Sequence, residues 1–214
     1  MKIIYFVRHG ESEGNIGTIR QSSDTPLSPH GRQQAEIIAQ RASHLTFDVI
    51  ISSTLKRAEE TAQAISKKTN KDIEYSDLFV ERVHPVDLYG ISKTDPRSVE
   101  AGETIRKNFA VPGFRYADEE NAKDLMDRAQ EALKFLTNRP EEHILVATHG
   151  FFLRIVMARA VFGDTLTEKE TDDFVRTFQT ENTGITVFSY DETKPKPWRV
   201  LTWNDYAHLA ELEG

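Results

Sequence analysis

Several short runs of hydrophobic residues along the chain lack a helical period. Residues 2–7 (KIIYFV), 48–52 (DVIIS) and 143–148 (HILVAT) are rich in β-branched and other apolar side chains, as strands buried on both faces are. Near the end of the chain, residues 184–190 and 198–204 form two further runs, joined by a loop that contains prolines. This pattern predicts three buried strands and a hairpin at the edge of their sheet.

Between the strands, apolar residues recur with the spacing of amphipathic helices. The clearest case is the segment 29–44, where Ser28 is placed to cap the helix and Pro29 to occupy its first position. After the second strand, Ser53 and Thr54 are cap candidates for the next helix. The helices predicted in this way cover residues 29–44, 53–69, 118–137, 151–162 and 167–178. Strands that alternate with helices predict an α/β sandwich with a mostly parallel sheet.

Residues 82–117 do not fit this alternation. They contain Pro85, Pro96 and Pro112 and show no sustained period, so no long helix or strand is predicted there. We interpret the segment as a small cap or lid inserted over the site. Because single cores grow to about 250–300 residues, a chain of 214 residues is expected to form one domain, residues 1–214, that carries this insertion.

Composition narrows the range of functions. The chain has no cysteine, which excludes disulfide bonds, thiolate catalysis and cysteine-ligated metal sites. The 27 Lys and Arg residues are outnumbered by 34 Asp and Glu and are scattered, so nucleic-acid binding is not supported. The apolar run at the N-terminus is too short for a signal sequence or a membrane span. We therefore expect a cytoplasmic protein that binds neither nucleic acid nor membrane.

Three polar clusters directly follow predicted strands. They occupy residues 8–10 (Arg-His-Gly), 52–57 and 148–150 (Thr-His-Gly). Because ligands of parallel sheets bind at the carboxyl ends of the strands, these clusters are expected to meet in one crevice. The loop after the first cluster, residues 11–15, combines small polar residues with glycine, and its backbone N–H groups can surround an anion. Together these features predict a pocket for an anionic ligand.

Four segments share a family pattern in their order and spacing. RHGESEGN (8–15), DTPLSPHGRQQA (24–35), SSTLKRAEETA (52–62) and THG (148–150) resemble the motifs of the histidine phosphatase superfamily, also called phosphoglycerate mutase-like. The resemblance implies a three-layer α/β/α sandwich with a mostly parallel central sheet and a small inserted cap. It also implies a metal-independent phosphoric monoester hydrolase that works as the histidine acid phosphatases do, through a phosphohistidine, without a cofactor.

The resemblance assigns roles to four residues. It implies that His9 is the nucleophile, with Arg8, Arg57 and His149 around the phosphate. The physical chemistry agrees, because a phosphomonoester carries nearly two negative charges and its transition state spreads charge over three oxygens. Two guanidinium groups match phosphate oxygens, and His149 adds a third positive group if it is protonated. To attack, His9 must be neutral, with its other ring nitrogen held by an acceptor.

The leaving alcohol needs a proton from a general acid. The acid phosphatases and phytases of the superfamily place an acid directly after the second histidine, but here Gly150 and Phe151 follow, which disfavours that branch. The other branch uses a glutamate after the third strand–helix unit, and Glu81 in DLFVERVHP matches it. The mutase form of this element, ERHYG, is absent, so Asp87 stays open as the alternative acid.

Further contacts to the substrate are predicted around the phosphate and in the insertion. The residues expected to bind the substrate are Arg8, Asn15, Gln21, Ser22, Arg57 and His149. In the insertion, Arg82, His84 and Arg97 are candidates to line the lid around an anionic leaving group, although each fits a solvated loop equally well. Residues 182–184 (NTG) resemble the entry of the family's closing strand, and we interpret them as structural.

The expected partner is a small-molecule phosphomonoester whose identity the sequence does not determine. In addition to binding this substrate, the protein could form a homodimer. Near the C-terminus, Trp198, Trp203 and Tyr206 could cover the edge of the sheet or form the contact between two copies.

Hydrolysis is preferred over three alternatives. A phosphomutase would use the same phosphohistidine, but the mutases of the family have a longer segment between the acid and the second histidine than 81–149, and they carry ERHYG. A non-catalytic binder of phosphorylated ligands is disfavoured because both histidines and both arginines are present. A zinc site made by His9, His84 and His149 is disfavoured because an arginine-rich pocket repels cations, so no metal site is expected.

Overall fold

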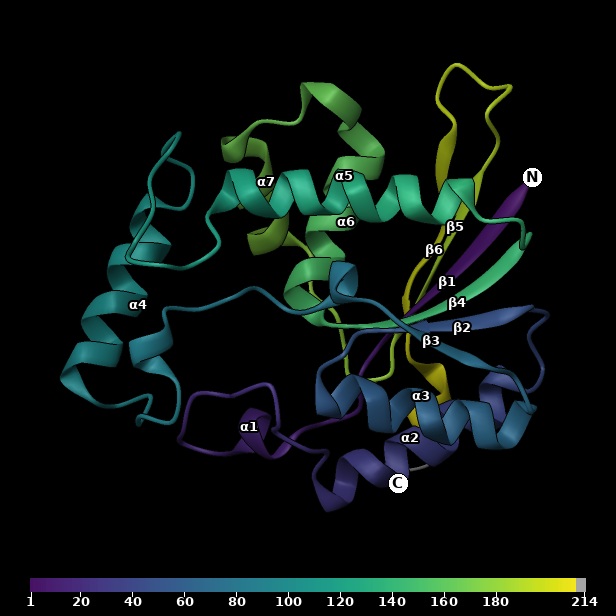
Figure 1. The fold of residues 1–214 in the computed structure, drawn as a ribbon, viewed down its shortest axis with the longest axis horizontal. Coiled ribbons are helices and arrows are strands. Elements are labelled where there is room, and N and C mark those ends of the chain that lie inside the picture. The colour runs from purple at the N-terminus through teal and green to yellow at the C-terminus, as the bar shows by residue number, and fades with distance from the viewer. Residues whose placement is uncertain (211–214) are drawn as a thin grey trace.

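A mixed sheet of six strands forms the centre of the structure, a computed structural model that describes residues 1–210 (Figure 1). The strands are β1 (Lys2–Arg8), β2 (Val49–Ser52), β3 (Ile73–Tyr75), β4 (His143–Thr148), β5 (Ile185–Tyr190) and β6 (Trp198–Asp205). Their order is β3-β2-β4-β1-β5-β6. Strands β1 to β4 and β6 run in one direction, whereas β5 runs antiparallel to its neighbours β1 and β6. The mostly parallel sheet and the edge hairpin are confirmed, and β3 is an addition to the predicted strands.

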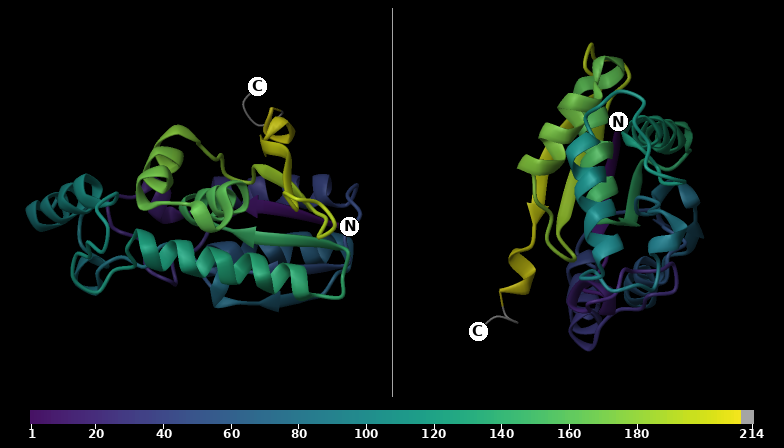
Figure 2. Two further views of the ribbon diagram at one scale, coloured as in Figure 1. Left: turned by 90° about the horizontal axis from the view of Figure 1, so that it is seen from above. Right: turned by 90° about the vertical axis from the view of Figure 1, so that its left-hand side faces the viewer.

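Helices cover both faces of this sheet (Figures 1 and 2). Those of one face are α2 (Pro29–Ala42) and α3 (Lys56–Thr69), and those of the other are α5 (Ala122–Asn138), α6 (Gly150–Phe162) and α7 (Glu168–Thr177). Alternate side chains of β1 enter the two cores between the layers, because Ile4 and Phe6 pack with α5 and α6 while Val7 packs with α2 and α3. The three-layer α/β/α sandwich is therefore confirmed.

The helix starts agree only in part with the sequence prediction. Helix α2 begins as predicted, since the Ser28 hydroxyl accepts a hydrogen bond from a backbone N–H of the first turn at 2.9 Å and Pro29 is its first residue. Helix α3 has Leu55 in the cap position and no side-chain cap, so the prediction that Ser53 or Thr54 caps it is wrong. The Ser53 hydroxyl instead accepts a hydrogen bond from the Leu55 N–H at 3.2 Å, and Ser53 lies directly after β2.

The inserted segment 82–117 contains a helix that the sequence pattern does not predict. Helix α4 (Pro96–Asn108) begins after Asp95, whose carboxylate caps the first turn, and lies outside the sandwich, at the left in Figure 1. The buried residues of this helix are Ser98, Ala101 and Ile105. Such a narrow stripe, in which only Ile105 is a large apolar residue, gives no clear apolar period. The loop after β1 holds the helix, because the Arg20 Nε donates to the Ser98 hydroxyl at 2.6 Å.

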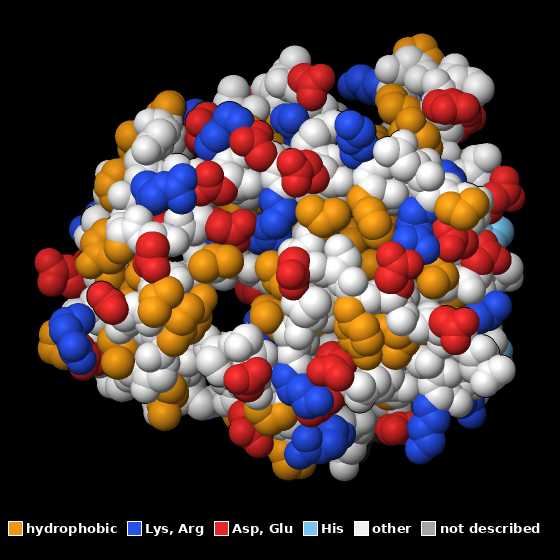
Figure 3. Space-filling view, viewed as in Figure 1, with side chains coloured by type: hydrophobic (Ala, Val, Ile, Leu, Met, Phe, Trp, Pro, Cys, Tyr) orange, Lys and Arg blue, Asp and Glu red, His pale blue; other side chains and the backbone are white. Residues whose placement is uncertain are grey.

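The surface seen in Figure 3 carries mixed charges. Lys and Arg side chains are interspersed with Asp and Glu over this face rather than gathered into a basic stripe. Within residues 1–210, no helix combines the length and the apolar character needed to cross a membrane. Trp198 and Trp203 pack against a core cluster, whereas Tyr206 is exposed. The cytoplasmic location and the homodimer stay predictions.

Candidate active site

A cavity of about 710 Å³ opens at the carboxyl ends of β1, β2 and β4. Arg8, the last residue of β1, pairs in register with the last residue of β4, so the segments that follow these strands lie side by side. Arg8, His9, Arg57 and Glu81 line the cavity, and part of segment 82–117 forms its other wall. Figure 3 shows a hollow between this segment and the sandwich. The polar clusters that follow the strands thus converge as the topology predicts.

His9 is held in one orientation and one tautomer. Its Nδ1 lies 2.6 Å from the Gly10 carbonyl oxygen, and because a carbonyl can only accept, Nδ1 carries the proton. The other nitrogen, Nε2, therefore accepts a hydrogen bond from the Arg57 Nε at 3.3 Å. Burial lowers the pKa of His9 well below its ordinary value, and the charges of Arg57 and Arg8 lower it further. His9 is thus neutral near pH 7, as an attacking imidazole must be.

Arg8 and Arg57 place two guanidinium groups beside His9. Arg57, the second residue of α3, is only 4% exposed. Arg8 donates to the Thr180 carbonyl oxygen, and its buried Nε has no partner among the described residues. Burial lowers the pKa of both arginines, and the charge of Glu81 opposes that shift. At an effective dielectric constant near 20, each cation would attract an anion 4 Å away by about 4 kcal/mol before desolvation.

His149 follows β4 and occupies the cap position of α6. The centre of its ring is 5.0 Å from that of His9, and its Nε2 lies 2.8 Å from the Ser53 hydroxyl. Burial lowers the pKa of His149 well below its ordinary value, and Arg57 and His9 contribute to the shift. In the protein alone His149 is therefore neutral near pH 7 and is not the third cation. A phosphoryl dianion beside it would favour its protonated form.

Glu81 lies in the cavity wall and points at the start of α6. One carboxylate oxygen accepts hydrogen bonds from the Phe152 and Arg82 N–H groups at 3.0 Å, and the other accepts from the Phe151 N–H at 3.2 Å. The N-terminus of a helix favours such a negative charge. Asp87, in contrast, is exposed and does not line the cavity. Of the two candidate acids, the structure brings Glu81 and not Asp87 to the cavity.

The remaining predicted contact residues divide into two sets. Those that line the cavity are Asn15, Gln21, Ser22, Arg82 and His84. Part of the Asn15 amide is already engaged, since its Oδ1 accepts from the Ser12 N–H at 2.9 Å as a cap of the short helix α1 (Glu13–Ile16). Arg97 does not line the cavity, because its side chain is 74% exposed and pairs with Asp95. The prediction that Arg97 lines the lid is therefore wrong.

Several residues at the cavity are absent from the sequence prediction. Those that line it are Arg20, Tyr89, Lys93 and Arg154. Arg154 lies one helical turn after the Thr-His-Gly motif, and its Nε donates to the Gly150 carbonyl oxygen at 3.0 Å. Asn182, which the sequence gives a structural role, donates from its amide to the His9 carbonyl oxygen at 2.8 Å. The contact of Ser53 with His149 was also not predicted, and the only signal for it in the sequence is that Ser53 directly follows β2.

The half-buried His84 ring predicts a loss of stability in mild acid. Burial and then the charge of Arg82 lower the pKa of His84 to about 4, whereas an unfolded histidine takes up its proton near pH 6.5. Between these values the unfolded chain binds more protons than the folded chain does. The free energy of unfolding therefore decreases as the pH is lowered, by on the order of 3 kcal/mol. Below about pH 4 both states are protonated, and this contribution levels off.

Urea unfolding from pH 7 to pH 4.5 measures the effect. His84→Asn is expected to lose less stability over this range than the wild-type protein. His44→Asn serves as the control, because His44 is exposed, and it is expected to follow the wild type. A His84→Asn variant whose stability falls as steeply as that of the wild type would contradict the assignment.

The chain is similar to known proteins along nearly its whole length. The family model described as histidine phosphatase superfamily (branch 1) matches residues 4–206. Phosphoglycerate mutase-like protein 4 of Arabidopsis thaliana is 33% identical over 217 residues, covering 97% of this chain and 87% of the relative. The solved structure of Bacillus stearothermophilus YhfR aligns with a TM-score of 0.80 at 25% identity, over 98% of this chain and 100% of that one.

A third protein shares the fold. The phosphoserine phosphatase from Entamoeba histolytica, solved with 3-phosphoglyceric acid, aligns with a TM-score of 0.75 at 24% identity, over 98% of this chain and 100% of that one. The family match spans all four sequence motifs and confirms the resemblance they carry. The chain belongs to the histidine phosphatase superfamily, branch 1.

Proposed function

We propose that this protein hydrolyses small phosphomonoesters without a metal ion or cofactor, through a phosphoryl group carried on His9. The observation that carries the proposal is the state of the His9 ring. Its Nδ1 proton is held by the Gly10 carbonyl oxygen, so the lone pair of Nε2 faces the Arg57 guanidinium, and Arg8 lines the same cavity. A neutral nucleophile next to a cationic, donor-rich pocket is the arrangement that phosphoryl transfer to histidine requires.

In the first step, His9 Nε2 attacks the phosphorus atom in line with the ester oxygen. The new N–P bond forms as the P–O ester bond breaks, and the bonding electrons stay on the leaving oxygen. The phosphoryl dianion that binds in the same cavity favours the protonated form of Glu81, against the N–H groups that favour its carboxylate. Protonated Glu81 gives the leaving oxygen a proton, so that a neutral alcohol departs. Arg8 and Arg57 stabilise the charge on the transferred group, and His149 joins them once it is protonated.

In the second step, water attacks the phosphohistidine. Glu81, now a carboxylate, takes a proton from the water as its oxygen bonds to phosphorus. The N–P bond breaks, its electrons return to His9 Nε2, and inorganic phosphate is released. The cycle restores both the neutral imidazole and the protonated acid, so no other reactant is consumed.

Hydrolysis and mutase activity differ in whether water reaches the phosphohistidine. Asn15 and Ser22 line the cavity and are exposed, so the rim of the cavity adjoins solvent on the side of the loop after β1. Solvent access of this kind supports hydrolysis. The names of similar proteins point both ways, since the Arabidopsis relative is named mutase-like and the amoebic structure is a phosphatase.

The zinc alternative has no support in the geometry. Within residues 1–210, no three His, Asp or Glu side chains form a group that could hold a metal ion. His84 therefore does not complete a site with His9 and His149. A measurement of turnover distinguishes the hydrolase from the alternative of a non-catalytic binder.

Turnover in the presence of EDTA tests the proposal. We expect the protein to release inorganic phosphate from p-nitrophenyl phosphate and from several alkyl phosphates at rates that EDTA does not change. With 3-phosphoglycerate, phosphate release is expected to exceed formation of the 2-phospho isomer. Isomer formation with little phosphate release would favour the mutase, and binding without turnover of any ester would favour the non-catalytic binder.

A further inference from the structure

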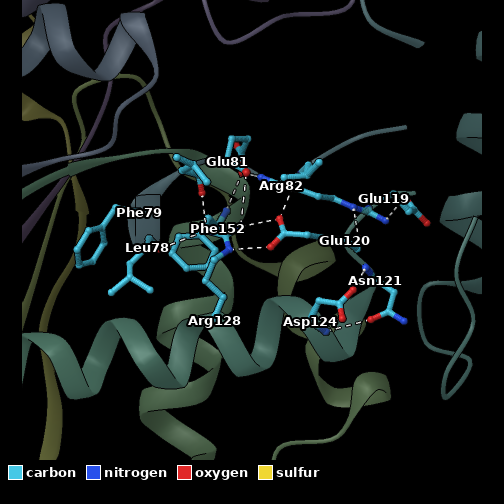
Figure 4. A network of polar contacts seen from close by, with 12 residues as sticks. Leu78, Phe79, Glu81, Arg82, Glu119, Glu120, Asn121, Asp124, Arg128 and Phe152 are labelled. Atoms are coloured by element: carbon cyan, nitrogen blue, oxygen red, sulfur yellow. Dashed lines mark hydrogen bonds and ion pairs between the residues drawn. The ribbon is translucent and has the colours of Figure 1, made fainter. Parts of the chain in front are cut away.

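Arg128, on α5, reaches from behind the cavity to the stretch of chain that carries Glu81 (Figure 4). We propose that Arg128, fixed by Glu120, is a positioning residue that holds Glu81 where it can protonate the leaving group. The proposal rests on the function given above, in which Glu81 is the general acid. Arg128 does not line the cavity, so it acts through Glu81 rather than on the substrate.

The chain around Glu81 needs such support. A short 3-10 turn (Asp77–Phe79) lies just before Glu81, and neither helix nor strand pairing satisfies the carbonyl groups of Leu78, Val80 and Glu81. Arg128 supplies the missing donors. Its Nη1 donates to the Leu78 carbonyl oxygen at 3.2 Å and to the Val80 carbonyl oxygen at 2.8 Å, and its Nη2 reaches the Glu81 carbonyl oxygen at 3.4 Å.

Glu120 fixes the guanidinium itself. The Arg128 Nε and Nη2 donate to the two carboxylate oxygens of Glu120, each at 2.7 Å, in a bidentate pair. With the three carbonyl contacts, all five N–H donors of the guanidinium are used. Both side chains are largely buried, at 13% and 18% exposed, so the pair is shielded from water and its geometry is well defined.

The same guanidinium contacts the residue that holds the Glu81 carboxylate. Its central carbon lies 3.8 Å from the centre of the Phe152 ring, and the Phe152 N–H donates to Glu81 Oε1. Figure 4 shows Arg128 next to Phe152 and Glu120, with Glu81 above them. Arg128 therefore fixes both the main chain of Glu81 and the helix start to which its side chain is bonded.

A loosened Glu81 has a specific kinetic consequence. A general acid matters for a leaving group that is unstable without a proton, such as an alkoxide, and matters little for p-nitrophenolate. Misplacement of a catalytic group by about 1 Å can cost about 100-fold in rate. We therefore expect Arg128→Gln to lower kcat/KM for glycerol 2-phosphate by about 10- to 100-fold, and for p-nitrophenyl phosphate by no more than about 3-fold.

Four further variants make the measurement interpretable. Arg128→Lys keeps the charge but loses the fork, and Glu120→Gln keeps Arg128 but weakens its anchor, so both are expected to show the same selective loss in smaller degree. Glu81→Gln calibrates the loss expected when the acid is absent. Arg159→Gln is the matched control, because Arg159 has a similar exposure of 12% and also bonds a carbonyl group, but lies near the far end of α6.

The outcomes separate the two proposals. If the wild type releases phosphate from neither ester, the proposed function is wrong. If the wild type is active and Glu81→Gln loses both esters equally, Glu81 is not the general acid and the assignment of Arg128 fails with it. If Glu81→Gln is selective but Arg128→Gln lowers both esters equally, Arg128 has only a structural role and the positioning proposal is overturned.

Discussion

Replacing His9 with alanine is expected to lower kcat/KM for p-nitrophenyl phosphate by on the order of 10⁴-fold or more. The alanine variant keeps both arginines but has no nitrogen that can carry the phosphoryl group. Phosphate release in EDTA, followed with enzyme at high concentration, measures the loss. His44→Ala is the matched control, because His44 is exposed and lies outside the cavity, and it is expected to keep wild-type activity.

The fold should survive this change. His9 is buried beside two cations and is held neutral, so its loss removes no favourable charge interaction. Activity of His9→Ala within about 10-fold of the wild type, with the control unchanged, would remove His9 from the role of nucleophile.

Replacing Arg57 with methionine is expected to lower kcat by about 10²- to 10³-fold, the usual effect of removing one donor aimed at transition-state charge. The variant is expected to be at least as stable as the wild type, because Arg57 is a buried cation whose bonds go to the His9 ring and the Ser22 carbonyl oxygen rather than to a carboxylate. Steady-state kinetics and urea unfolding of the same preparations measure both effects.

Two companions sharpen this test. Arg57→Lys keeps the charge without the planar fork, and an intermediate loss is expected. Arg41→Met removes a surface arginine that pairs with Asp205, and no loss is expected. An Arg57→Met variant that unfolds more easily and loses activity in proportion would show that Arg57 acts on the fold rather than on the phosphate.

The fold could largely be predicted because the buried strands have a simple sequence pattern. Strands covered on both faces, such as β1 and β4, are continuous apolar runs, and the long helices repeat apolar residues along one side. Strand β3 was not predicted because its three residues are too few for a pattern and two of them are exposed. Helix α4 was not predicted because its buried stripe is narrow. Asp95 followed by Pro96 is nevertheless a helix start signal that could have indicated it.

The site could be predicted where its residues follow strands directly. His9 and His149 come directly after β1 and β4, and Arg57 lies in the first turn of the helix that follows β2. They come together because the topology brings the ends of parallel strands to one edge. Contacts made through backbone groups, such as the Gly10 carbonyl that fixes His9, leave no trace in side-chain identity. Arg128 could not be predicted either, because its role depends on how α5 packs against the segment that carries Glu81.

Trapping the phosphorylated enzyme tests the central claim most directly. The protein would be mixed with p-nitrophenyl phosphate, quenched within milliseconds in alkali, which preserves phosphohistidine, and digested for mass spectrometry. We predict one added phosphoryl group on the peptide that contains His9, lost on mild acid treatment and absent from His9→Ala. An active enzyme that carries no phosphoryl group at any time point, or carries it on another residue, would contradict the account.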